Sequence, residues 1–104
     1  MNICLLTDKY PPDVGGLAVS TRRLAHGLAQ AGHAVWVSAP TASIAPGQII
    51  TSGDGPVCVS RLGAHRRADD TLADWFDLIA ALQARHHFDL LHALYIAQPA
   101  FVAV

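Results

Sequence analysis

Hydrophobic positions along the chain alternate between short unbroken runs and longer segments with helical spacing. Residues 2–7 form an apolar run that ends before a polar pair and a double proline. Such a run is typical of a strand buried on both faces of a parallel sheet. Similar runs predict further strands at 34–39, 57–61 and 90–94.

The segment after the first strand predicts a helix over 17–31. Gly32 follows it at the place where a left-handed residue commonly ends a helix. The positions expected to face the sheet recur at helical spacing. They are Leu17, Thr21, Leu24, Leu28 and Ala31.

A second helix is predicted over 70–86, with Asp69 and Asp70 offering an N-cap. Its expected core side carries Leu72, Trp75, Phe76, Ile79 and Leu82. Trp75 and Phe76 also allow a second interpretation, a belt for peripheral membrane association, because a basic cluster precedes the helix. The acidic residues of the helix favour packing on the sheet instead, since they would repel an anionic surface.

The order of elements is strand, helix, strand, loop, strand, helix, strand, followed by the start of a third helix near Pro99. This order predicts an α/β fold, a doubly wound parallel sheet of the Rossmann-like kind, in spatial order 3-2-1-4. Residues 41–56 are rich in Thr, Ser, Gly and Pro and predict a loop that allows an edge hairpin. The apolar end at 101–104 predicts a fragment that stops inside a buried helix.

Composition narrows the functional classes. A chain of 104 residues with 14% charged side chains and a net charge of −1 forms one folded domain and offers no basic field for nucleic acid. The N-terminus lacks a basic n-region and a long apolar segment, which predicts a cytoplasmic protein. Cys4 and Cys58 fall in strands with another strand between them, so both are expected to be reduced core thiols beyond disulfide reach.

Gly15 and Gly16 lie between the first strand and the first helix. Backbone without Cβ lets a ligand approach closely, and the free N–H groups of a helix N-terminus favour a phosphate or diphosphate. The alternative, a plain turn that needs positive φ, stays open on these residues alone. The fingerprint G-x-G-x-x-G is absent and Ser38-Ala39-Pro40 ends the second strand without an acidic residue, which disfavours a dehydrogenase.

Several motifs together resemble the retaining GT-B glycosyltransferases of family 4. The likeness begins with Asn2-Ile3-Cys4-Leu5-Leu6-Thr7-Asp8, Tyr10-Pro11-Pro12 and Gly15-Gly16. It continues through Leu24-Ala25, Leu28 and Ala31-Gly32-His33-Ala34-Val35, and it returns at Phe88-Asp89-Leu90-Leu91-His92-Ala93. The resemblance implies that residues 1–104 are a partial N-terminal, acceptor-side domain and that the C-terminal nucleotide-sugar domain is absent.

The resemblance also implies a reaction and a set of site residues. The complete enzyme would transfer a sugar from a nucleotide sugar to a glycan, lipid or small-molecule acceptor, without a metal or another cofactor. Gly15 and Gly16 would meet the donor diphosphate, and Tyr10 and Asp13 would lie on the acceptor side. His92 is a weak catalytic candidate, because Leu94 stands where the family frequently has a second histidine. The fragment alone is expected to be inactive.

A function from another class is kept beside this one. A free-standing flavodoxin-like module that binds a nucleotide would share the predicted strand and helix order. It would be expected to end in a covering helix with polar terminal residues, whereas this chain ends in apolar ones. No metal site is predicted, because the neighbouring His86 and His87 point apart on a helix.

Overall fold

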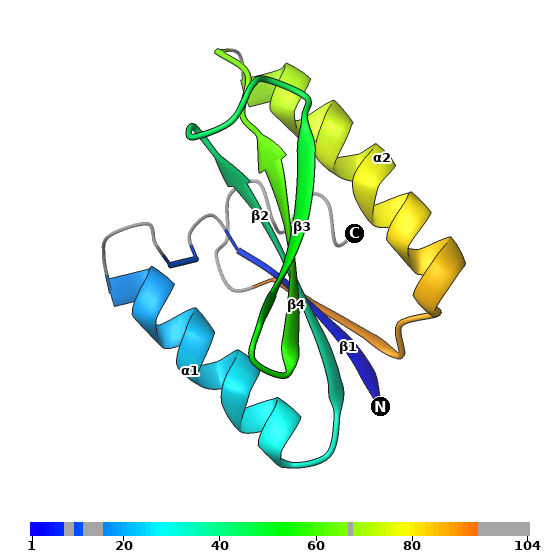
Figure 1. The fold of residues 1–104 in the computed structure, drawn as a ribbon. Coiled ribbons are helices and arrows are strands. Elements are labelled where there is room, and N and C mark those ends of the chain that lie inside the picture. Colours follow the sequence, from blue (N-terminus) through cyan, green and yellow to red (C-terminus); the bar gives the residue numbers. More distant parts are fainter. Residues whose placement is uncertain (8–9, 12–15, 67, 94–104) are drawn as a thin grey trace.

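The computed structural model describes residues 1–7, 10–11, 16–66 and 68–93 of the chain. Five strands and two helices follow one another in this described part (Figure 1). They are β1 (Asn2–Leu6), α1 (Gly16–Gln30), β2 (Ala34–Thr41), β3 (Ile49–Asp54), β4 (Val57–Gly63), α2 (Ala68–His86) and β5 (Leu90–Ala93). The predicted start of a third helix near Pro99 lies outside the described residues.

The strands form one sheet in the order β3-β4-β2-β1-β5. β4, β2, β1 and β5 pair in parallel, which confirms the predicted order of the four parallel strands and the inner position of β1. β3 lies at the edge of the sheet and pairs antiparallel with β4. The two strands form the edge hairpin that the predicted loop at 41–56 allowed. Gly55 in the hairpin turn has φ 60°, a conformation that glycine adopts readily.

The two helices cover opposite faces of the sheet (Figure 1). The chain moves from β1 to β2 in one direction and from β4 to β5 in the other, so two right-handed crossovers place α1 and α2 on different sides. Alternate side chains of the strands point to these two faces. Ile3, Leu5, Val35 and Val37 join the core under α1, and Cys4, Leu6 and Leu62 join the core under α2.

The face of α1 that meets the sheet agrees with the predicted one at Thr21 and Leu28 but not at Leu24. Ala18, Thr21 and Ala25 are buried, whereas Leu24 is 39% exposed. Small side chains at the centre of the contact let the helix lie close to the sheet, which moves the larger leucines to its margin. The end of the helix is as predicted: Gly32 has φ 96° and its N–H donates to the carbonyl of Ala29.

The second helix begins two residues earlier than predicted, so Asp69 and Asp70 lie in its first turn rather than at the N-cap. Carboxylates there still favour the helix, because its N-terminus carries the positive end of the dipole. Trp75 is fully buried and its Nε1 donates to Ser38 Oγ at 2.8 Å. Phe76, predicted to share the core side, is 44% exposed, because the next residue on a helix points about 100° away.

The two cysteines lie in β1 and β4 with β2 between them, as predicted. Cys4 is fully buried, and burial raises the pKa of its thiol to about 12. Cys58 is exposed, so its assignment to the core is wrong. On the face that α2 covers, Leu62 joins the core, whereas Cys58 near the beginning of the same strand stays open to solvent.

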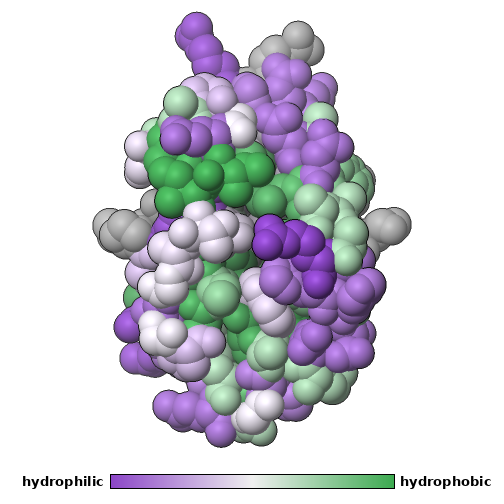
Figure 2. All heavy atoms as spheres, turned by 45° about the vertical axis from the view of Figure 1, so that its right-hand side comes forward, coloured by the Kyte–Doolittle hydropathy of each residue, from purple (hydrophilic) through white to green (hydrophobic). Residues whose placement is uncertain are grey.

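Part of the hydrophobic surface stays open to solvent. Figure 2 shows hydrophobic side chains bordered by hydrophilic ones on the face that it presents. Ile49 and Ile50 on the edge strand β3 are 47% and 41% exposed. No helix in the described part of the chain has the length and apolar character needed to cross a bilayer.

Two glycines give a paired test of this fold. A Cβ on Gly63 would overlap the carbonyl of Ala45, whereas a Cβ on Gly27 in α1 meets no atom within 4 Å. We expect Gly63→Ala to lower the free energy of unfolding by about 1–3 kcal/mol through overpacking. Gly27→Ala should raise it by roughly 0.5–1 kcal/mol through helix propensity. Urea unfolding of both variants checks this, and equal effects would contradict the packing of the 45–48 turn on Gly63.

Candidate functional site

The sheet has a topological switch point between β1 and β5. From β1 the chain passes over one face through α1, and it arrives at β5 over the other face through α2. Leu6 pairs with Ala93, so both strands end at the same edge of the sheet. Open α/β sheets bind ligands beyond the carboxyl ends of their strands at such a point. The connection from β1 to α1 and the end of β5 therefore flank the candidate site.

Gly16 is the first residue of α1 and is exposed. A Cβ built on it meets no atom of the described residues within 4 Å, and its backbone is helical. The turn with positive φ that the sequence left open is therefore not formed at Gly16 itself. The helix has no acidic residue in its first turn, so no carboxylate of the helix itself neutralises the positive end of the dipole there. Gly15 and Asp13 lie outside the described residues.

The first turns of α1 are fixed against the end of β1 by buried hydroxyls. Thr7 Oγ1 lies 3.3 Å from Thr21 Oγ1, and Thr21 donates to the carbonyl of Leu17 at 2.7 Å. The N–H of Thr7 donates to the carbonyl of Ser38 in β2. This network holds the N-terminal turns of α1 at the carboxyl edge of the sheet.

Tyr10 lies between β1 and α1, and its side chain is only 1% exposed. Its hydroxyl donates to Asp54 Oδ2 at 2.6 Å. The phenol expected on the acceptor side is thus engaged inside the protein, where it anchors the connection. The placement of Tyr10 on the acceptor side stays a prediction.

Asp54, the last residue of β3, also binds two side chains of α1. Arg22 donates through Nε to Oδ2 at 2.9 Å, and His26 Nε2 lies 3.1 Å from the same oxygen. The turn approaches α1 so closely that a Cβ on Gly55 would lie 3.3 Å from the His26 ring. One carboxylate therefore joins the hairpin, the helix and Tyr10.

Arg61 in β4 holds the same connection from another side. Its guanidinium donates to the backbone carbonyls of Tyr10 and Pro11 and lies 5.7 Å from the centre of the Tyr10 ring. We call Asp54, Arg61, Tyr10, Arg22 and His26 the Asp54 cluster. The sequence placed Asp54 in a turn within the predicted loop at 41–56 and Arg61 in a predicted strand and a basic cluster, and it gave neither residue a role in the site.

The hydrogen bonds of Asp54 shift its pKa and that of Tyr10 in opposite directions. Donation from Arg22, and then from Tyr10, holds the pKa of the Asp54 carboxyl well below its usual range. Burial, and then the bond to Asp54, raises the pKa of the Tyr10 phenol. Both groups are therefore held in the charge states that their hydrogen bond requires at neutral pH.

This shift predicts a dependence of stability on pH. Because the pKa of Asp54 is lower in the folded chain, its contribution is fully present above the unfolded value of about 3.9 and is lost as the pH falls toward the folded value. We expect the difference in free energy of unfolding between the parent and Asp54→Asn to be largest near neutral pH and to shrink below about pH 4. Urea unfolding across this range measures it, and a difference that grows on acidification would contradict the assignment.

His92 is the third residue of β5 and is exposed. It pairs in register with Leu5 and lines an apolar groove of about 210 Å³ together with Leu24, Leu28 and Leu90. The histidine thus stands near the carboxyl edge of the sheet, but its surroundings are hydrophobic. Its catalytic role stays a prediction.

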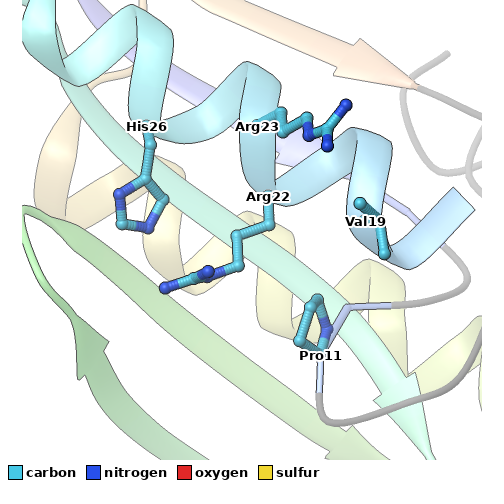
Figure 3. A pocket seen from close by; sticks show the side chains of 5 residues that line it. All are labelled: Pro11, Val19, Arg22, Arg23 and His26. Atoms are coloured by element: carbon cyan, nitrogen blue, oxygen red, sulfur yellow. The ribbon is translucent and has the colours of Figure 1, made fainter.

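A cleft of about 430 Å³ opens between α1 and the connection at Pro11. Figure 3 shows Arg22 and His26 extending from α1 toward the hairpin, while Arg23 points the other way. A second cleft of about 350 Å³ continues along Arg22, Asp54 and Arg61. Cationic side chains therefore border the side of α1 that faces the hairpin.

The comparisons with known proteins agree with this architecture. The sequence model of Glycosyltransferase Family 4 matches residues 14–104, and the chain belongs to that family. Sucrose-phosphate synthase from Thermosynechococcus elongatus is a similar solved structure, with a TM-score of 0.71 and 19% sequence identity. The match covers 97% of this chain and 28% of that one, so the chain spans just over a quarter of its length. No curated protein matches the chain.

This structural match confirms the predicted fold class. The mostly parallel five-stranded sheet with helices on both faces is a Rossmann-like half of a GT-B fold. Family membership favours the glycosyltransferase hypothesis over a free-standing flavodoxin-like module.

Proposed function

We propose that this chain is the N-terminal, acceptor-side part of a retaining glycosyltransferase. The complete enzyme would transfer a sugar from a nucleotide sugar to a glycan, lipid or small-molecule acceptor. Membership of glycosyltransferase family 4 supports the reaction class, and the fact that the chain spans 28% of the matched structure supports a longer active protein. The nucleotide-sugar domain would follow this segment.

The observation that carries the proposal is the position of Gly16. It opens α1 at the edge where β1 and β5 end, and no atom of the described part of the chain lies within 4 Å of where its Cβ would stand. Backbone N–H groups at a helix N-terminus stabilise a leaving diphosphate without a metal or another cofactor. Gly15 would extend the same surface, and His92 would stand near it on β5. The connection around Tyr10 and Asp13 would face the acceptor.

We propose a cytoplasmic location for the protein. A nucleotide-sugar donor suits a cytoplasmic enzyme. Peripheral association with a membrane, where a lipid acceptor would lie, would involve Phe76 rather than the buried Trp75.

An activity assay on two proteins tests the proposal. The 104-residue chain should release no detectable nucleoside diphosphate from UDP-, GDP- or ADP-sugars, because one diphosphate-facing loop cannot offset the entropy lost on binding. The product of the longest reading frame that contains the chain should release it, and ¹H NMR of the new glycoside should show the donor's anomeric configuration. Turnover by the 104-residue chain, or an inverted product, would contradict the proposal.

A further inference from the structure

The connection from β1 to α1 is held from outside by residues that come much later in the chain. Asp54 and Arg61 belong to the β3–β4 hairpin at one edge of the sheet, whereas Tyr10 and Pro11 follow the inner strand β1. Tyr10 contributes its hydroxyl, its ring and its backbone carbonyl to the contacts with these two residues. The described part of the connection is thus fastened to the hairpin by both its side chain and its backbone.

The same carboxylate also fixes the helix that the connection enters. Arg22 binds both oxygens of Asp54, at 2.9 Å through Nε and 3.3 Å through its terminal nitrogen. His26 binds one turn further along α1. Tyr10 precedes Gly16 and Arg22 follows it, so Asp54 holds the chain on both sides of the glycine. A change at Asp54 would therefore alter the place of Gly16 relative to the strands.

These contacts join a buried phenol and a partly exposed carboxylate to Arg22, whose side chain is 52% exposed. The Tyr10 side chain is almost fully buried, and the Asp54 side chain is 27% exposed. Hydrogen bonds to an ionised carboxylate are stronger than those between neutral groups. Three donors that converge on one carboxylate specify its position more closely than any single bond would.

We propose that Asp54 is a positioning residue, which sets the connection at Tyr10 and Pro11 and the start of α1 in the geometry that binds the donor diphosphate. This inference rests on the proposed function, since it assigns Asp54 a role in the site around Gly16. Asp54 itself would not touch the ligand. The edge hairpin would thus be part of the binding machinery and not merely a cover for the sheet.

Two other roles for Asp54 predict different results. If the carboxylate acted only through its charge, its removal would strengthen the binding of an anion nearby. If it only stabilised the fold, its removal would lower the melting temperature without changing the site of the folded protein. A positioning role predicts weaker anion binding despite the loss of a negative charge, and the sign of the effect therefore separates the roles.

The test uses the ¹⁵N-labelled 104-residue chain, inorganic diphosphate as the probe, and three variants. Asp54→Asn removes the carboxylate charge, and Tyr10→Phe removes one hydrogen bond to it without changing the net charge. Asp77→Asn is the control, because Asp77 is an exposed residue of α2 and makes the same charge change on the opposite face of the sheet. The Kd comes from the shift of the Gly16 amide during titration. The order parameter of the residue 10 amide is measured without ligand.

We expect Asp54→Asn to raise the Kd about fivefold or more and Tyr10→Phe to raise it about two- to fivefold, as the loss of one or more hydrogen bonds implies. Asp77→Asn should stay within about twofold of the parent. The order parameter of residue 10 should fall from a rigid value near 0.85 toward about 0.6 in Asp54→Asn. Tyr10→Phe keeps the buried ring, so it serves the test even if Asp54→Asn unfolds.

An unchanged or lower Kd in folded Asp54→Asn or in Tyr10→Phe would overturn the positioning role. An equal rise in Asp77→Asn would overturn it as well. If the Gly16 amide of the parent does not respond to diphosphate, the proposed diphosphate site fails and the order parameter alone decides the inference. A lowered value in the variants would then support the positioning of the connection by Asp54, and an unchanged value would overturn it.

Discussion

Replacing Gly16 by valine should lower kcat/KM by on the order of a hundredfold in a full-length glycosyltransferase that carries this chain. No atom of the described residues lies within 4 Å of a Cβ at this position, and Gly16 is part of the helix. Valine should therefore leave the fold intact and meet only the ligand. It would push the diphosphate away from the first amides of α1, which are worth roughly 3 kcal/mol to a developing charge.

Gly27→Val is the matched control for this substitution. Gly27 lies in the same helix and is equally free of neighbours within 4 Å, but it is far from the N-terminal turn. Its kcat/KM should stay within about twofold of the parent, since surface changes of this kind are usually small. The melting temperatures of both variants are measured on the same samples. If Gly16→Val keeps parental activity per folded molecule, the diphosphate role of Gly16 is wrong.

Truncating Trp75 to alanine should destabilise the 104-residue chain by about 3–5 kcal/mol. Trp75 is the largest fully buried side chain among the described residues, and it packs in the core under α2. Its removal would also leave Ser38 Oγ without the donor that now reaches it at 2.8 Å. For a chain of this length the melting temperature should fall by roughly 15 °C or more.

Phe76→Ala is the control, because it removes an aromatic ring from the neighbouring residue of the same helix. Phe76 is 44% exposed, so its truncation should change the free energy of unfolding by no more than about 1 kcal/mol. Thermal unfolding followed by circular dichroism compares the two variants. Similar losses would show that α2 is rotated on the sheet relative to the arrangement in the structure.

The sequence predicted the four parallel strands because each contains a short apolar run between turn residues, whereas the largely polar β3 was predicted only as a loop that allows a hairpin. The predicted strands at 2–7 and 90–94 correspond to β1 (Asn2–Leu6) and β5 (Leu90–Ala93), and β1 lies inside the sheet as the resemblance implied. Gly32 also ends α1 as expected, since positive φ at that position is a local property. Features set by neighbouring residues could therefore be read from the chain alone.

The helix faces could not be read in the same way, because they depend on how closely two elements approach. Leu24 fits the apolar stripe by spacing, yet alanines occupy the centre of the contact and Leu24 stays 39% exposed. Phe76 and Cys58 are hydrophobic residues within predicted elements, which is why the sequence places them in the core. Their exposure follows from the rotation of α2 and from the part of β4 that it reaches.

The candidate site was predicted only where a motif is continuous in the sequence. The position of Gly16 at the start of a helix follows from the strand, the glycine pair and the helix that succeed one another. The contacts of the Asp54 cluster join residues that are 28 to 51 positions apart, and no local pattern links them. The turn around Asp54 could be recognised, but the contact of that turn with α1 and Tyr10 is a product of the sheet order.

A map of amide shifts in the 104-residue chain, recorded by NMR during titration with inorganic diphosphate, tests the central claim most directly. The proposed site predicts the largest shifts at Gly16 and in the first turn of α1, with a Kd in the millimolar range or weaker for so small a ligand. Shifts concentrated in the cleft at Arg22, Arg23 and His26, with Gly16 unmoved, would contradict it.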